Sequence, residues 1–173
     1  MTLTLVLGGA RSGKSAFALD QAQAAAGGDR ALTLVATAQA FDAEMTDRIA
    51  RHRAERGPQW RTIEAPLALA DVLDALTAQD VAVVDCLTLW LTNVMLGEMD
   101  LAGETEGLLA AAGRTRGQVF YVSNEVGLSI VPDNVLARRF RDEAGRLNRL
   151  MAARADRVTM LFAGLPLQLK PLP

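Results

Sequence analysis

The residues whose types and spacing most clearly indicate chemistry lie close to the N-terminus. The pattern G-x-x-x-x-G-K-[ST] is matched by Gly8-Gly9-Ala10-Arg11-Ser12-Gly13-Lys14-Ser15. In this pattern the glycines let backbone N–H groups turn toward phosphate oxygens, and the following helix adds the positive end of its dipole. Lys14 is expected to reach the β- and γ-phosphates of a nucleoside triphosphate, and the Ser15 hydroxyl to hold Mg²⁺. The run predicts a phosphate-binding loop; a glycine-rich turn without a ligand is the alternative.

A second protein ligand for Mg²⁺ is expected at the end of another strand. Asp85 closes the apolar run Val81-Ala82-Val83-Val84, so its carboxylate can hold Mg²⁺ directly or through water. The same residue could instead cap the helix that begins near Leu87. The phosphate-binding loop favours the metal-binding interpretation.

The single histidine, His52, lies in a segment dense in arginine, from Arg48 to Arg56. On a helix, Met45, Ile49 and His52 would share one face, which is typical of a structural histidine. The neighbouring positive charges disfavour the imidazolium form and keep the ring neutral, the form that attacks phosphorus. The residues alone leave both roles open.

Polar residues also follow a later apolar strand and open a long helix. Asn124 and Glu125 are expected at the carboxyl end of the sheet, where ligands of open α/β folds bind. Glu125 could orient a hydroxyl nucleophile or a metal-bound water, or both residues could be ordinary caps. Arg138, Arg139 and Arg141 could bind a second anionic substrate, with surface ion pairs as the alternative.

These groups require elements that bring them to one edge. Short apolar runs alternate with helical segments, which predicts parallel strands joined by crossover helices. The predicted strands are Leu3–Leu7, Ala31–Ala36, Val81–Asp85, Val119–Ser123 and Arg157–Phe162. The predicted helices are Lys14–Ala26, Asp42–Glu55, Leu67–Thr77, Leu87–Leu96, Glu104–Arg114 and Asn134–Ala155.

The strands are continuously apolar, so helices are expected on both faces of the sheet. We therefore predict a doubly wound α/β fold: a single-domain P-loop NTPase of the RecA-like type, spanning residues 1–173, with a mostly parallel sheet flanked by helices. A length of 173 residues, with 50% apolar residues, suits one large core.

Composition excludes several classes of protein. The net charge of −2 argues against a general nucleic-acid binder. The longest apolar stretch, Cys86 to Leu96, is much shorter than the roughly 20 residues of a membrane-spanning helix. Cys86 is the only cysteine, so no internal disulfide is possible, and no secretory leader is evident. We expect a cytoplasmic protein.

Several segments together resemble one enzyme family. They are Gly8–Ser15, Ala36–Ala38, Asp42–Met45, Arg48–Arg53, Trp60–Glu64, Asp85–Asn93, Asn124–Gly127, Ile130–Asn134 and Ala137–Asp142. Over nearly its whole length the chain is similar to the bifunctional adenosylcobinamide kinase / adenosylcobinamide-phosphate guanylyltransferases of cobalamin biosynthesis. The stretch from Gly97 to Gly117 is short relative to longer members, which puts peripheral shape and subunit contacts in doubt.

The resemblance implies two reactions and a set of residues for them. A nucleoside triphosphate, ATP or GTP, phosphorylates adenosylcobinamide, and GMP is then transferred from GTP to that phosphate through a guanylylated histidine, which matches His52. Contacts to the guanine nucleotide are implied for Gly8–Ser15, Ala36, Thr37, Ala38, Arg53, Ala54, Glu55, Arg56, Glu64 and Asp85. A homotrimer is implied as well. The alternatives are a P-loop kinase of another small metabolite without covalent nucleotidylation, and a nucleotide-switched binding module.

Overall fold

The computed structural model describes residues 2–39 and 57–171. Its strands are β1 (Thr2–Gly8), β2 (Ala31–Ala36), β3 (Trp60–Glu64), β4 (Asp80–Asp85), β5 (Gln118–Asn124), β6 (Arg157–Phe162) and β7 (Leu165–Lys170). Its helices are α1 (Lys14–Ala26), α3 (Leu69–Ala75), α4 (Leu87–Leu96), α5 (Leu101–Arg114) and α6 (Val135–Arg154).

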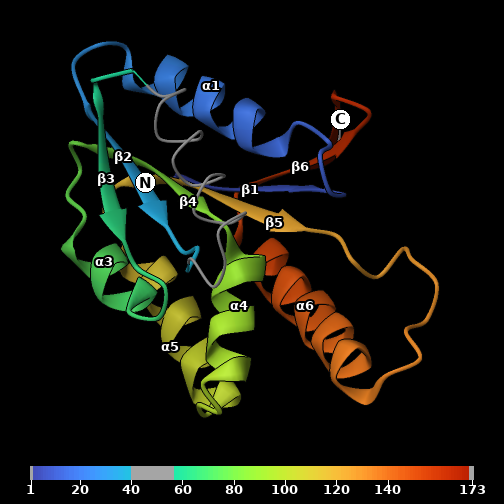
Figure 1. Ribbon diagram of the computed structural model, residues 1–173. Coiled ribbons are helices and arrows are strands. Elements are labelled where there is room, and N and C mark those ends of the chain that lie inside the picture. Colours follow the sequence, from blue (N-terminus) through green and yellow to red (C-terminus); the bar gives the residue numbers. More distant parts are fainter. Residues whose placement is uncertain (1, 40–56, 172–173) are drawn as a thin grey trace.

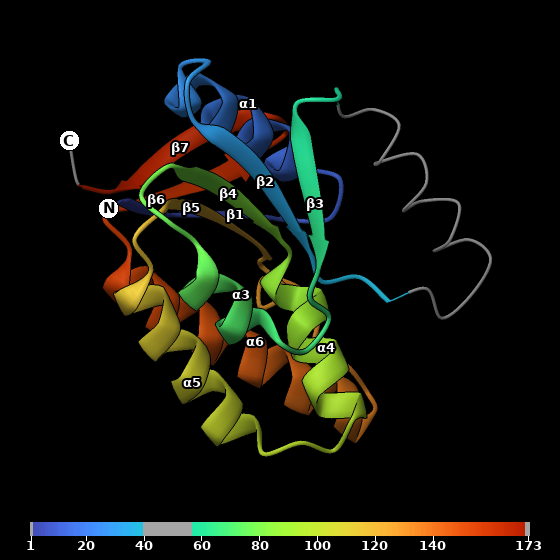
Figure 2. The ribbon, with the colours of Figure 1, turned by 90° about the vertical axis from the view of Figure 1, so that its left-hand side faces the viewer.

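The strands form one seven-stranded sheet in the order β3-β2-β4-β5-β1-β6-β7 (Figure 1). Every pair is parallel except β6 with β7. α1 covers one face, and α3, α4, α5 and α6 cover the other, as Figure 2 shows from the side. The prediction of a mostly parallel sheet with helices on both faces is confirmed.

The core has two parts, one on each side of the sheet. On the α1 face, small side chains of α1 pack against Leu34, Val83 and Val122. On the other face a larger cluster is built around Trp90, Tyr121 and Met151. Because alternate side chains of each central strand enter these two clusters, both faces are buried and the strands read as continuous apolar runs.

The two edge strands and some helix bounds differ from the prediction. β3 and β7 were not predicted, because exposed edge strands lack the continuous apolar run that marks a buried strand. α5 begins at Leu101 instead of Glu104, since the Asp100 side chain accepts a hydrogen bond from the Ala102 amide and caps the helix there. α3 is shorter than Leu67–Thr77. The predicted helix Asp42–Glu55 lies outside the described residues.

Two further expectations are that no helix spans a membrane and that the stretch from Gly97 to Gly117 is short. Among the residues that the structure describes, no helix has the length and apolar character needed to cross a membrane. The short stretch from Gly97 to Gly117 contains α5, whose buried residues include Leu108 and Leu109. This stretch therefore adds a helix to the larger core cluster.

α4 is tied to the ends of the neighbouring strands by buried polar side chains. The Asn93 carboxamide donates to the Thr37 carbonyl at 2.8 Å and to the Pro66 carbonyl at 2.9 Å. The Trp90 indole N–H donates to the Leu67 carbonyl at 3.1 Å. These bonds hold the chain segments that leave β2 and β3 against α4, and so fix the carboxyl edge of the sheet.

We predict that Asn93→Ala lowers the free energy of unfolding by about 1–3 kcal/mol, because two buried carbonyl groups lose their donor. Urea denaturation followed by circular dichroism measures the change. The control is Thr92→Ala, whose hydroxyl bonds only to its own helix; its effect should stay within about 0.5 kcal/mol. Equal effects of the two variants would contradict a special role for Asn93.

Candidate active site

The candidate site is built along the carboxyl ends of the parallel strands. In the sheet register, Glu64 pairs with Ala36, Ala36 with Asp85, and Gly8 with Asn124. β5 stands between the strand that leads into the phosphate-binding loop and the strand that ends in Asp85. Parallel pairing therefore brings together residues from separate parts of the sequence at one edge.

The same residues share one face of the sheet. Val83 and Val122 pack in the core cluster that contains α1, and so does Val6. Side chains alternate along a strand, so Asp85, Asn124 and Gly8, each two residues further on, belong to that face. The carboxylate, the carboxamide and the start of the loop thus lie on the side of the sheet where α1 begins.

The last glycine of the phosphate-binding loop has a conformation that glycine favours. Gly13, which precedes α1, has φ of 89°, a left-handed conformation that glycine adopts without strain. Lys14 is 9% exposed, and its ammonium group donates to the Gly9 carbonyl at 3.0 Å. The lysine therefore folds back over the loop, where it can meet phosphate oxygens.

Gly8 allows the loop to lie close to the sheet. A Cβ atom at Gly8 would stand 2.3 Å from Ser12 Oγ and 3.1 Å from the Leu161 carbonyl oxygen. Ser12 Oγ is buried and has no hydrogen-bond partner among the described residues. A buried hydroxyl without a partner is uncommon and fits a loop built to bind a polar ligand.

Asp85 is held by Thr37, the residue that follows β2. The Cys86 amide donates to Thr37 Oγ1 and that hydroxyl donates to the Cys86 carbonyl, both at 2.7 Å. The Thr37 amide donates to the Asp85 carbonyl at 3.1 Å, and the Thr37 carbonyl accepts from Asn93. Every polar group of Thr37 is thus engaged within the protein. Thr37 positions the backbone of Asp85 and Cys86.

Burial and two nearby charged side chains change the pKa of the Cys86 thiol. Burial, helped by the nearby negative charge of Asp85, raises the pKa of Cys86 to about 11, while the positive charge of Lys14 opposes this rise. At neutral pH the thiol is protonated, so Cys86 is not a nucleophile in this site. Asp85 and Lys14 both act on one thiol, which places the two charged groups in one neighbourhood.

The residues present fit a magnesium ion bound together with a triphosphate. Mg²⁺ prefers oxygen ligands and is usually held by one or two protein groups plus phosphate oxygens and water. Ser15, in the first turn of α1, supplies a hydroxyl, and Asp85 supplies a carboxylate on the same face of the sheet. These two groups would hold the ion, which would neutralise charge on the phosphates.

Three polar side chains that the sequence did not single out support the end of β5. Ser123 Oγ donates to Asn148 Oδ1 at 2.7 Å and lies 3.3 Å from the Thr88 hydroxyl. The Asn124 amide donates to Thr88 Oγ1 at 2.7 Å, and the Asn148 carboxamide donates to the Asn124 carbonyl at 3.0 Å. Asn148 lies inside α6. No local pattern connects it with β5, so only the fold reveals the contact.

Other candidate residues have contacts that favour their structural alternatives. Glu125 Oε1 accepts from the Gly127 amide at 2.7 Å, which closes a turn. Arg138 donates to the Pro132 and Asp133 carbonyls at the start of α6. Arg141 forms an ion pair with Asp142 at 3.1 Å. The binding of a second anionic substrate by Arg138, Arg139 and Arg141 stays a prediction. His52 and Arg53–Arg56 lie outside the described residues.

Comparisons with known proteins match nearly the whole chain. Residues 4–169 match the family described as cobinamide kinase / cobinamide phosphate guanyltransferase. The chain is 51% identical to the bifunctional adenosylcobalamin biosynthesis protein CobP of Pseudomonas aeruginosa, over 98% of both chains. It is 36% identical to the bifunctional adenosylcobalamin biosynthesis protein CobU of Escherichia coli, over 97% of this chain and 99% of that one.

Solved structures with a similar fold include a flagellar accessory protein and an ATPase domain. The flagellar accessory protein FlaH of Methanocaldococcus jannaschii superposes with a TM-score of 0.53 at 14% identity, over 98% of this chain and 78% of that one. A second solved structure, an isolated ATPase domain, superposes with a TM-score of 0.52 at 14% identity, over 93% of this chain and 69% of that one. The fold is that of a RecA-like P-loop NTPase, as predicted.

We predict that Lys14→Ala lowers kcat/KM for phosphoryl transfer from a nucleoside triphosphate at least about 100-fold, since a preorganised cation is lost. Initial rates of nucleoside diphosphate release measure the effect. Lys170→Ala is the matched control, because this lysine donates to carbonyls at the end of α6 and pairs with Val158 at the start of β6. If folded Lys14→Ala protein turns over at the wild-type rate, the loop does not take part in phosphoryl transfer.

We predict that Asp85→Asn raises the Mg²⁺ concentration needed for half-maximal activity by about tenfold or more, because a charged ligand is lost. The melting temperature should change little. Asp80→Asn, at the other end of β4, is the control: Asp80 accepts bonds from Thr77, so its variant should keep the wild-type Mg²⁺ titration. An unchanged titration for Asp85→Asn with a lowered melting temperature would instead support a purely structural role.

Proposed function

The chain belongs to the cobinamide kinase / cobinamide phosphate guanyltransferase family, and from this premise we propose that it catalyses both reactions on adenosylcobinamide. A nucleoside triphosphate, ATP or GTP, first phosphorylates the free hydroxyl of adenosylcobinamide. GMP is then transferred from GTP to that phosphate, which gives adenosylcobinamide-GDP and pyrophosphate. The observation that carries the proposal is that Asp85 ends β4 on the face of the sheet where α1 begins with Lys14 and Ser15.

In the kinase step the hydroxyl oxygen attacks the γ-phosphorus of the bound triphosphate. The bond from that phosphorus to the bridging oxygen breaks, the nucleoside diphosphate leaves with the electron pair, and the hydroxyl proton passes to solvent. Lys14 and the backbone N–H groups of the loop offset negative charge on the phosphates. Ser15 and Asp85 would hold Mg²⁺, which would screen the same negative charge.

In the guanylyltransferase step we assign the nucleophile to His52. A neutral imidazole nitrogen attacks the α-phosphorus of GTP, pyrophosphate leaves with the electron pair, and the imidazole proton passes to solvent. The result is a phosphoramidate, from which an oxygen of adenosylcobinamide phosphate then displaces the histidine. A covalent intermediate replaces one direct exchange between two anions by two steps. The support is the match of His52 to the guanylylated position of the family.

We assign the remaining nucleotide contacts to residues around this edge. Ala36 ends β2, which lies beside β4, and Ala38 follows it. Glu64 is exposed at the end of β3, which lies beside β2. Arg53, Ala54, Glu55 and Arg56 are assigned by sequence match alone. Thr37 contributes by holding Asp85, because its own polar groups are engaged.

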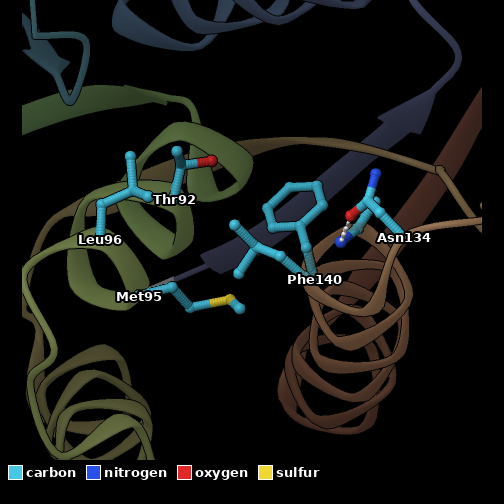
Figure 3. A pocket seen from close by; sticks show the side chains of 7 residues that line it. Thr92, Met95, Leu96, Asn134 and Phe140 are labelled. Atoms are coloured by element: carbon cyan, nitrogen blue, oxygen red, sulfur yellow. Dashed lines mark hydrogen bonds between the residues drawn. The ribbon is translucent and has the colours of Figure 1, made fainter.

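The expected homotrimer is supported by an apolar surface. Leu128 is 76% exposed and Ile130 is 93% exposed, in the segment between β5 and α6. Nearby, a pocket of about 340 Å³ lies between α4 and α6, with Met95 and Phe140 in its lining (Figure 3). Exposed apolar surface of this kind commonly marks contacts between proteins. We propose that a second copy of this chain covers it; the cytoplasmic location stays a prediction.

We predict that wild-type protein keeps radioactive label from GTP labelled at the α-phosphate, but not from GTP labelled at the γ-phosphate, after denaturing electrophoresis. The adduct should be acid-labile and comparatively stable to base, as a phosphoramidate is. His52→Ala should retain no α label and lose guanylyltransferase activity, while its kinase step survives in part because that step needs no covalent intermediate. Normal α labelling of His52→Ala would show that the histidine is structural. No labelling of the wild type would favour a kinase without covalent nucleotidylation.

A further inference from the structure

Two buried polar atoms without partners flank the first glycine of the phosphate-binding loop. They are Ser12 Oγ and Asn124 Oδ1, and neither has a hydrogen-bond partner among the described residues. Ser12 Oγ lies 2.3 Å from the position that a Cβ of Gly8 would take, and Asn124 pairs with Gly8 in the sheet register. Buried polar groups are nearly always hydrogen-bonded, so two exceptions beside one loop indicate a ligand that completes them.

The backbone around Asn124 is held on three sides. Its amide donates to Thr88 Oγ1 and its carbonyl accepts from Asn148, while the next amide, of Glu125, donates to the Gly8 carbonyl at 3.1 Å. The position of this residue is therefore fixed by β1, α4 and α6 together. Only its side chain has no bond within the described protein.

The side chain lies on the face of the sheet where the phosphates bind. Phe120 and Val122, on the same face of β5, pack in the cluster that contains α1. Asn124 continues that alternation at the carboxyl end of β5, one strand from Gly8 on one side and one strand from Asp85 on the other. A carboxamide at this point stands between the loop that binds phosphate and the carboxylate that holds the metal.

The structural alternatives for this residue are taken by its neighbours. Glu125, not Asn124, closes the turn that follows β5. The cap of α6 is Asn134, whose side chain accepts from the Ala137 amide. The Asn124 carboxamide therefore serves neither as the turn nor as the cap that asparagine usually provides.

We propose that the Asn124 carboxamide is a catalytic group of the kinase step, which donates a hydrogen bond to the phosphoryl group as it leaves the triphosphate. Phosphate oxygens only accept hydrogen bonds, so the amino group of the carboxamide faces them. No hydrogen bond distinguishes the oxygen from the nitrogen of this side chain, and half a turn about its last bond exchanges them. The bond strengthens as charge develops on the transferring group, and so favours the transition state.

This inference rests on the proposed kinase function, and its test is steady-state kinetics with adenosylcobinamide and ATP or GTP. Asn124→Ala should lower kcat at least about 100-fold and leave the KM for the triphosphate within about threefold, because the bond is made in the transition state. Asn124→Asp, which keeps the shape but replaces the donor with a negative charge, should lose at least as much. Gln118→Ala, which removes a carboxamide from the other end of β5, is the control and should keep wild-type kcat.

A second readout separates this inference from the kinase proposal itself. ADP and GDP are each bound with Mg²⁺ and aluminium fluoride, which together imitate a phosphoryl group in transfer. The wild type should bind the diphosphate more tightly with aluminium fluoride than without it, and Asn124→Ala should lose about tenfold or more of that gain. The affinity for the diphosphate alone should stay at the wild-type value. This measurement needs no corrinoid, so it stands even if wild-type protein does not phosphorylate adenosylcobinamide.

Several results would overturn the inference. A kcat for Asn124→Ala within about threefold of wild type would do so, as would a raised KM at constant kcat, which indicates ground-state binding only. Recovery of the wild-type rate after correction for the folded fraction would show that the residue is structural. If Asn124→Ala does not fold, a normal rate for Asn124→Asp contradicts the inference by itself.

Discussion

Parallel pairing of β2, β4, β5 and β1 is the constraint on which the site depends. It brings Ala36, Asp85, Asn124 and Gly8 to one edge of the sheet, although long stretches of sequence separate them. The alternation of side chains then places the polar residues of this edge on the α1 face. A shift of one residue in any strand would turn its polar side chain to the opposite face. The two apolar clusters oppose such a shift, so the core fixes the geometry of the site.

The side chains that support this edge of the sheet are uncharged. The charged side chains of the edge face the place proposed for the ligand. Thr37, Thr88, Asn93, Ser123 and Asn148 hold the strand ends through hydroxyl and carboxamide bonds within or beside the core. Lys14, Asp85 and the start of α1 are the groups that we propose for contact with phosphate and metal charge. Fixed neutral supports cost little reorganisation during the reaction, which is the condition under which preorganised charges stabilise a transition state. The raised pKa of Cys86 removes a competing nucleophile from the same place.

Much of the scaffold was predictable because its determinants are local. The loop pattern and the five apolar strands could be located from short runs of sequence, and the helix from Leu87 to Leu96 has the predicted bounds. The edge strands β3 and β7 could not, since exposed residues such as Arg61 and Gln168 do not mark a strand. The contacts of Asn93 and Asn148 depend on which segments the fold brings together, so no local signal shows them. The sequence placed Asn124 near the site, but only the structure separates its role from that of Glu125.

We propose that a triphosphate binds at the carboxyl edge of the sheet, on the α1 face, with its terminal phosphate between Lys14 and Asn124. A crystal structure with a non-hydrolysable GTP analogue and Mg²⁺ measures this directly. It should show the β- and γ-phosphates against the backbone amides of residues 9–15, the metal near Ser15 and Asp85, and the Asn124 carboxamide within hydrogen-bond distance of the terminal phosphate. Phosphates bound elsewhere on the chain, or an Asn124 side chain turned away from them, would contradict the account.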